Sequence, residues 1–303
     1  MKIAYIVLAH SNVEQVLRLA NSISNTGDVY IHFDKKCNID GIEKKIENNP
    51  SVNLVEKRIM VSWAGWSVVK AYITSIIQAL ESPKKYDRFV MLTGQDYPLM
   101  KDSQIIDEFE KNKDIEYIMA YNVATSTILT DKNKTKMRWY MDSPFKLRFL
   151  HRAYKSFMYR FVTKVFKRKD FRVPLNGKMV NPYFGQMLSA FTRQGAELIV
   201  NTYLTDKKYN KRMKNAHAPD ELYWQTIIFN SDLRKNTIQH GEEHEITEHF
   251  GWAPLHYHTY TIDTSIYTEK DFDELKNSGY MFCRKVVPGV SDSLMDKIDE
   301  MRR

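Results

Sequence analysis

The fold class is indicated first by residues 2–11, which read KIAYIVLAHS. An almost unbroken apolar run of this kind is typical of a strand that is buried on both faces of a parallel sheet. The run ends at His10, a polar residue at the point where such a strand would reach solvent. It contains a single lysine and no small-residue cleavage site, so we interpret it as a first β-strand rather than a signal peptide.

The following segments alternate between strand and helix. We expect further strands at 28–33, 52–55, 88–92 and 116–120, and helices at 13–23, 67–80 (with Ser67 as N-cap) and 103–111. Repeated βα units of this kind give a mostly parallel, doubly wound sheet flanked by helices. The sequence therefore predicts an α/β, Rossmann-like fold whose ligands bind beyond the carboxyl ends of the strands.

The second half of the chain lacks the regular alternation of strand and helix, but it contains no internal repeat and no low-complexity linker. Helices are expected at 193–204, from 219 to about 229, and at 270–277. One continuous domain over residues 1–303, with two halves at 1–120 and 121–303, fits this organisation better than separate modules.

Composition excludes several classes of protein. The chain has 303 residues, a formal charge of +8 and 43% hydrophobic residues, which excludes disorder, collagen and coiled coil. No apolar run approaches the roughly 20 residues that a transmembrane helix needs. Two cysteines make no disulfide framework. We therefore expect a soluble protein of a reducing cytoplasm, with basic surfaces.

The basic excess is concentrated in residues 146–172, which hold ten Lys or Arg and one acid, Asp170, interleaved with aromatic residues. One interpretation is a solvated helix whose aromatic face packs on the core. Another is docking on an anionic membrane surface, because basic residues beside aromatic ones suit the headgroup region. Nucleic acid is a third, although no nucleic-acid-binding signature accompanies the segment.

Polar residues follow three of the expected strands, namely His10, Asp34 and Asp96. Asp34 follows the second strand, where an acid could hold a ribose hydroxyl. The chain has no GxGxxG after its first strand and no GxxxxGK[ST], which disfavours a standard dinucleotide site and a P-loop NTPase.

Two short motifs have both a structural and a functional interpretation. In the tripeptide PDE at 219–221, Asp220 and Glu221 could simply stabilise a helix N-terminus, or Glu221 could act as a general base at the rim of a pocket. In WAGWS at 63–67, Trp63 and Trp66 could pack in the core or stack on a sugar or base.

The sequence motifs give little support for a metal site or for a nucleophilic cysteine. HEITEH at 244–249 differs by one position from the HExxH zinc motif, and His256 and His258 lack an evident third ligand. Asp96 has no second acid to form a DxD motif, so a diphosphate ligand would imply metal-free chemistry. Cys283 stands beside Arg284, which would lower a thiol pKa, but no neighbouring residue supports a nucleophile role.

Five segments occur in a specific order: AYIVLAH at 4–10, HFDKK at 32–36, VSWAGWS at 61–67, LTGQDYPL at 92–99 and PDE at 219–221. Together they resemble the core-2/I-branching β-1,6-N-acetylglucosaminyltransferase and xylosyltransferase family (glycosyltransferase family 14), in its bacterial branch. A weaker sixth segment extends from 268–272 to 282–285, so the resemblance covers residues 1 to about 290.

This resemblance implies a GT-A glycosyltransferase that inverts the anomeric centre and needs no metal. Residues 1–120 would form the nucleotide-binding half and 121–303 the acceptor-binding and catalytic half. Glu221 would deprotonate the acceptor hydroxyl, with Asp220 beside it on the substrate side. Lys285 would neutralise the leaving diphosphate with help from Arg284 or His256, since His256 stands where the family has an arginine. The other expected contacts are His10, Asp34 and Asp96 to the nucleotide, and Trp63 and Trp66 to the substrate.

The resemblance also implies a function. We expect transfer of a sugar, GlcNAc or a related one, from a UDP-sugar to a glycan or lipid-linked glycan in bacterial surface polysaccharide synthesis. The enzyme would be cytoplasmic and peripheral on the inner membrane through residues 146–172, without a nucleic-acid partner. A metal-dependent GT-A transferase and a non-catalytic basic protein that docks on membrane or nucleic acid stay open as alternatives.

Overall fold

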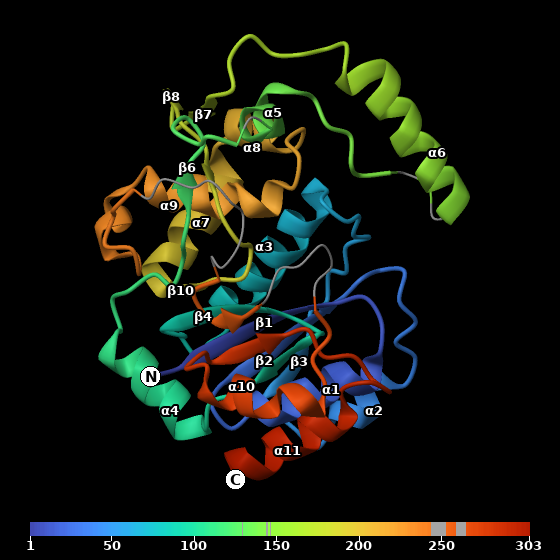
Figure 1. Ribbon diagram of the computed structural model, residues 1–303, viewed down its shortest axis with the longest axis vertical. Coiled ribbons are helices and arrows are strands. Elements are labelled where there is room, and N and C mark those ends of the chain that lie inside the picture. The colour runs from blue at the N-terminus through green and yellow to red at the C-terminus, as the bar shows by residue number, and fades with distance from the viewer. Residues whose placement is uncertain (129, 144, 146, 244–252, 259–264) are drawn as a thin grey trace.

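A computed structural model describes residues 1–128, 130–143, 145, 147–243, 253–258 and 265–303. Its centre is a five-stranded sheet in the order β10-β4-β1-β2-β3 (Figure 1). The strands are β1 (Ile3–Ala9), β2 (Asp28–Phe33), β3 (Val52–Leu54), β4 (Arg88–Thr93) and β10 (Ala190–Thr192). The first four are parallel, and β10 adds an antiparallel edge. This arrangement confirms the predicted α/β fold. The HEITEH motif at 244–249 lies outside the described residues.

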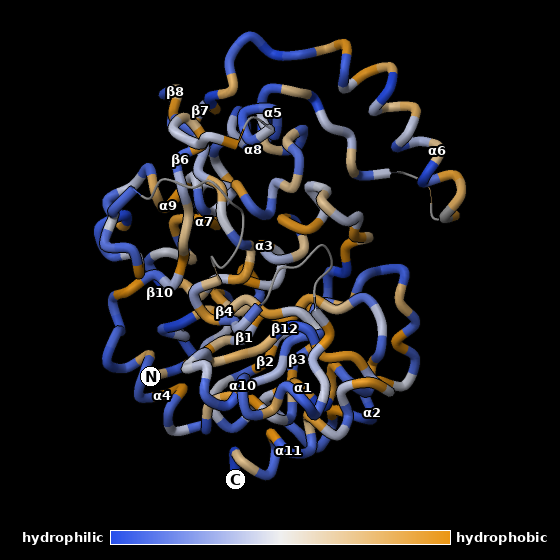
Figure 2. The backbone as a smooth tube through the Cα atoms, viewed as in Figure 1, coloured by the Kyte–Doolittle hydropathy of each residue, from blue (hydrophilic) through white to orange (hydrophobic). Residues whose placement is uncertain are grey.

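Helices cover both faces of this sheet because β1 is apolar on both sides. Its odd-numbered residues pack in one core with helices α1 (Val13–Ile23), α2 (Ile42–Ile46) and α4 (Asp102–Lys111). Its even-numbered residues pack in a second core with α3 (Trp66–Glu81), α7 (Arg193–Thr205) and α9 (Tyr223–Phe229). Figure 2 shows hydrophobic segments in the central strands and polar ones along the outer helices.

A smaller sheet joins the end of the chain to its first half. It consists of β11 (His256–Tyr257), β12 (Phe282–Arg284) and β5 (Asp96–Pro98), in that order. A third apolar core joins this sheet to α10 (Phe272–Asn277) and α11 (Asp292–Arg302). Asp299 of α11 accepts hydrogen bonds from Arg18 Nη2 and from the Tyr97 hydroxyl, both at 2.7 Å.

The remaining elements lie on the other side of the central sheet (Figure 1). They are α5 (Asp131–Lys136), α6 (Arg148–Met158), α8 (Lys207–Met213), and the strand pairs β6 (Tyr121–Asn122) with β9 (Tyr183–Phe184) and β7 (Val173–Leu175) with β8 (Lys178–Val180). Helix α6 continues into a π-helical turn, Tyr159–Thr163, and projects from the body of the molecule. Among the described residues, no helix has the length and apolar character needed to cross a membrane.

Three expectations about local structure are wrong in detail. Residues 116–120 form no strand; Glu116 and Tyr117 make isolated bridges only, and the buried Glu116 carboxylate instead binds the N–H (2.9 Å) and hydroxyl of Thr192. Ser67 is not the N-cap of α3, because Gly65 holds that position. The helix expected from 219 begins at Tyr223, after a separate 3₁₀ turn over Pro219–Glu221.

Candidate active site

The carboxyl ends of three neighbouring strands meet at one edge of the central sheet. Leu8 of β1 pairs with Thr93 of β4, and Ala9 pairs with Phe33 of β2. The predicted residues His10, Asp34 and Asp96 follow these strands directly, so the structure brings all three to this edge. His10 is exposed there.

Asp34 is buried and already has an internal partner. Its Oδ1 accepts the backbone N–H of Lys36 at 2.9 Å, and its Oδ2 lies 3.2 Å from Lys36 Nζ. Asp34 therefore shapes the loop after β2.

Asp96 is fully buried and organises the next part of the site. Its Oδ2 accepts the Thr93 N–H at 2.8 Å and lies 3.2 Å from His256 Nε2, while its Oδ1 lies 3.0 Å from Arg284 Nη1. Burial alone would raise the pKa of Asp96, but His256, Arg284 and the Thr93 N–H outweigh burial and lower it to about 2. Asp96 is thus a permanent anion that positions two residues from the far end of the chain.

Basic side chains surround this anion. Arg284 and Lys285 are half-buried at the end of β12, and His256 is fully buried on the neighbouring β11. His258 lies close to Asp96, Arg284 and Lys285, and burial followed by the Arg284 charge lowers its pKa to about 4. The sequence had suggested His258 only as a metal ligand, and its place in this cluster was missed.

The PDE tripeptide forms the second part of the site. Ala218 adopts a left-handed conformation (φ 46°), a strained backbone for a residue with a side chain, and it introduces the 3₁₀ turn. Burial raises the pKa of Asp220 to about 6, and burial followed by the charge of Asp220 raises that of Glu221 to about 8. Lys134 of α5 opposes both shifts. Two such carboxyls titrate as a pair and share a proton near neutral pH.

Tyr72 of α3 lies near both of these groups. It is fully buried, its hydroxyl donates to the Leu92 carbonyl at 3.0 Å, and its ring meets the edge of Trp224 at 5.8 Å. Burial and the charges of Asp96 and Asp220 raise the pKa of Tyr72, while Arg284 opposes them. The Asp96 cluster and the PDE turn are therefore close enough for both to act on one side chain.

Several buried polar atoms of this region have no hydrogen-bond partner within the described part of the chain: Asp220 Oδ1, His256 Nδ1 and Trp224 Nε1. Buried polar atoms normally find a partner in protein, water or ligand. A polar ligand could therefore bond to these three atoms.

The two tryptophans of WAGWS have different positions. Trp66 is buried, stacked on Tyr203 at 6.0 Å and against the edge of Tyr223 at 5.2 Å. Core packing is therefore correct for Trp66 and the expected substrate contact is wrong. Trp63 is 77% exposed and available to a ligand.

Asp142, which no sequence motif indicates, fixes the start of α3. Its carboxylate accepts the Ser67 hydroxyl at 2.6 Å and the Ser67 N–H at 3.2 Å. A Cβ added to Gly65 would lie 2.2 Å from Asp142 Oδ1, so only glycine allows this approach. The two partners are 75 residues apart in sequence, which is why no local pattern predicts them.

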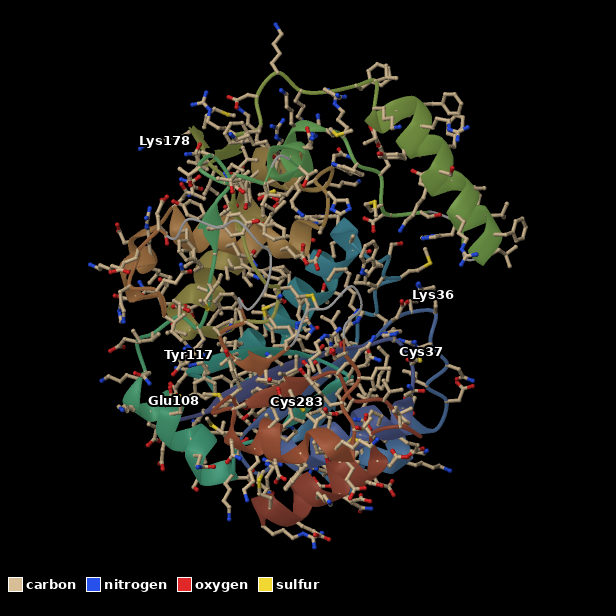
Figure 3. The ribbon with its side chains drawn as sticks, viewed as in Figure 1. Lys36, Cys37, Glu108, Tyr117, Lys178 and Cys283 are labelled. Atoms are coloured by element: carbon tan, nitrogen blue, oxygen red, sulfur yellow. The ribbon has the colours of Figure 1, made fainter. Side chains whose placement is uncertain are left out.

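The expectation of a lowered thiol pKa at Cys283 is wrong. Cys283 lies inside the molecule, whereas Cys37 lies toward its edge (Figure 3). Burial, followed by the charge of Asp96, raises the pKa of the Cys283 thiol. Across the described ranges, no group of three or more His, Cys, Asp or Glu is arranged to hold a metal ion.

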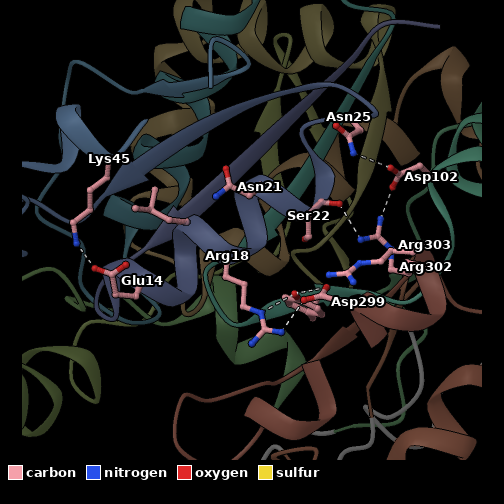
Figure 4. A pocket seen from close by; sticks show the side chains of 12 residues that line it. Glu14, Arg18, Asn21, Ser22, Asn25, Lys45, Asp102, Asp299, Arg302 and Arg303 are labelled. Carbon is pink, nitrogen blue, oxygen red and sulfur yellow. Dashed lines mark hydrogen bonds and ion pairs between the residues drawn. The ribbon is translucent and has the colours of Figure 1, made fainter. Parts of the chain in front are cut away.

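A concavity of about 990 Å³ between α1 and α11 contains none of the predicted site residues (Figure 4). Its charged groups pair with one another: Arg18 with Asp299 at 2.7 Å, and Arg302 with Asp102 at 2.6 Å. These ion pairs attach α11 to the body of the protein.

The chain is similar to several known proteins. Rat (Rattus norvegicus) xylosyltransferase 2 is 24% identical over 148 residues, which are 47% of this chain and 17% of that protein. The β-1,3-galactosyl-O-glycosyl-glycoprotein β-1,6-N-acetylglucosaminyltransferase 4 of Danio rerio is 23% identical over 313 residues, covering 98% of this chain and 69% of that protein. The crystal structure of S. aureus TarS 1–349 has a TM-score of 0.37 and 13% identity, over 77% of this chain and 56% of that one.

The match to the xylosyltransferase covers less than a fifth of that protein's length. The family model named Core-2/I-Branching enzyme, by contrast, matches residues 3–276, nearly the whole chain. This protein belongs to the Core-2/I-Branching enzyme family.

Proposed function

We propose that this protein transfers a sugar, GlcNAc or a related one, from a UDP-sugar to a hydroxyl of a glycan or lipid-linked glycan, with inversion and without a metal ion. The observation that carries the proposal is the pair of buried Asp220 and half-buried Glu221, near the basic cluster held by Asp96. The raised pKa values of both carboxyls suit proton transfer. The names of the relatives, which transfer xylose or N-acetylglucosamine, support the same reaction class.

The reaction is a single displacement. The acceptor oxygen attacks the anomeric carbon on the face opposite the nucleotide, and ionised Glu221 takes the hydroxyl proton. The bond between the anomeric carbon and the diphosphate oxygen breaks, and its electron pair leaves with UDP. One displacement at this carbon inverts its configuration. Asp220 keeps the pKa of Glu221 high, so that the base is strong when ionised.

Charge develops on the departing diphosphate, and basic side chains neutralise it. In our proposal Arg284 and Lys285 contact the phosphates, and His256 assists from β11. Asp96 acts as a positioning residue, because its oxygens are occupied by Thr93, His256 and Arg284. Cationic groups fixed in this way stabilise a leaving anion electrostatically and take the role that a divalent ion has elsewhere.

The remaining contacts complete the proposal. His10 and Asp34 lie at the strand ends where the nucleoside would bind, and Trp63 offers an exposed ring to a sugar. Cys37 and Cys283 are free thiols, which suits a reducing cytoplasm. We place the enzyme there, at the inner face of a bacterial membrane, in the synthesis of surface polysaccharide.

Calorimetric titration tests the donor site. We expect one donor among UDP-GlcNAc, UDP-Glc, UDP-Gal, UDP-Xyl and UDP-GlcA to bind saturably, equally well with and without EDTA. Arg284→Gln should weaken binding at least about 10-fold, since a hydrogen bond to a charged group contributes about 1.5–3 kcal/mol. The control Lys207→Gln changes an exposed residue of α8 and should not affect binding. Binding only with Mn²⁺ would instead support a metal-dependent transferase, and binding of no donor would contradict the proposal.

A further inference from the structure

Helix α6 and the turn after it form an arm, residues 147–166, that stands away from the rest of the molecule (Figures 1 and 3). The sequence has no acidic residue between Asp142 and Asp170. The arm therefore carries basic charge without compensation along its own length.

One side of the arm faces the body. His151, Tyr154, Lys155, Met158 and Val162 are half-buried and recur at helical spacing. Lys155 Nζ donates to the Trp63 carbonyl at 3.4 Å. This side fixes the arm beside the WAGWS segment, next to the candidate active site.

The opposite side presents aromatic rings to solvent. Phe149 is 66% exposed, and Phe157 and Phe161 are each 56% exposed, with their ring centroids 5.0 Å apart. Packing of the aromatic face on the core, one expectation from the sequence, is therefore wrong. A contiguous aromatic surface of this kind marks an interaction site rather than a solvated helix.

Exposed basic side chains also lie on the arm. Arg152, Arg160 and Lys164 are exposed, and Lys164 Nζ lies 5.0 Å above the Tyr159 ring. A partner for this surface must offer an apolar phase for the rings and anions for the basic groups. The headgroup region of an anionic bilayer offers both within a few ångströms. A second copy of the arm would bring like charges together.

We propose that the outward face of this arm docks on an anionic lipid bilayer. The arm contacts Trp63, so docking brings the candidate site to the surface where a lipid-linked acceptor resides. Only this consequence of docking rests on the proposed function. Binding to lipid needs no donor and no turnover. It can therefore fail or succeed independently of the transferase activity.

Co-sedimentation of the whole protein with phosphatidylcholine vesicles, with and without phosphatidylglycerol, tests the proposal. We expect binding only to the anionic vesicles. The variant Arg152→Gln, Arg160→Gln, Lys164→Gln should bind about 100-fold more weakly, from about 1 kcal/mol for each basic residue near the surface. The triple control Lys207→Gln, Lys208→Gln, Lys211→Gln removes the same charge from exposed positions of α8 and should bind within about 3-fold of the parent, because those residues lie away from the arm.

A third variant tests the rings. Phe149→Ser, Phe157→Ser and Phe161→Ser together should weaken vesicle binding about 100-fold while leaving UDP binding and thermal unfolding unchanged. Equal binding to neutral and anionic vesicles, or equal loss in the α8 control, would overturn the proposal. So would tighter binding to a DNA duplex than to the vesicles, with the same dependence on the arm, which would assign the surface to nucleic acid.

Discussion

Glu221→Gln should abolish turnover and stabilise the protein, and the stabilisation should grow with pH. The amide cannot accept the hydroxyl proton, so we expect turnover to fall by about 10³-fold with UDP binding nearly unchanged. The stability effect follows from the raised pKa of Glu221. Folding costs additional free energy whenever the half-buried Glu221 carboxyl is ionised.

The sign and size of the stability difference follow from the linkage between protonation and folding. The pKa of Glu221 rises from an ordinary 4.5 to about 8 in the folded protein, so its destabilising effect is small below 4.5 and grows as pH rises toward 8. Glutamine has no such dependence. Relative to the parent, the variant should gain less than about 1 kcal/mol at pH 5, about 3 at pH 7 and about 5 at pH 9.

Urea unfolding of both proteins near these three pH values measures the difference. Glu43→Gln, at an exposed position of α2, is the control and should follow the parent at every pH. A variant whose stability runs parallel to the parent would show that Glu221 is not held in a raised-pKa environment. A variant that retains a tenth or more of the parent's turnover would refute the base assignment.

Three further substitutions test neighbouring groups. Lys134→Met removes a charge that lowers the pKa of Glu221, so the acidic limb of the pH–rate profile should move to higher pH. Asp96→Asn leaves Arg284 without its buried partner. It should raise the KM for the donor, measured from the rate at varied donor concentration, and cost about 3 kcal/mol of stability, measured by urea unfolding. Asp142→Ala removes the carboxylate at the start of α3 and should cost about 1 kcal/mol in urea unfolding, with no change in the pH–rate profile.

The sequence predicted the central sheet well because its strands are buried on both faces. β1 is a continuous apolar run, β4 contains one at 89–92, and β2 is buried along its whole length although it includes Asp28 and His32. A polar residue follows β1 and β2, and Thr93 ends β4. The prediction of a strand at 116–120 was wrong because it relied on the local pattern alone. Its first residue, Glu116, is buried to bind Thr192, and no local pattern predicts that distant partner.

The residues of the candidate site likewise divide into those that the sequence predicted and those that it did not. The motif residues Asp96, His256, Arg284 and Glu221 were all predicted, and the structure brings the first three into direct contact. Lys134 and Asp142 were missed, because a single Lys or Asp outside any motif has no distinctive spacing. Cys283 was judged by its neighbours in sequence, whereas burial by residues distant in sequence sets its pKa.

The pairing of Asp96 with the end of the chain has a consequence for synthesis on the ribosome. Asp96 emerges 160 residues before His256 and 188 before Arg284. Until both have been translated, burying this carboxylate would leave an anion without its partners, which is strongly unfavourable. The nascent protein must therefore keep this corner open while the central sheet forms, and close it by adding β12 beside β5. The region around Asp96 is accordingly completed only after the central strands have been made.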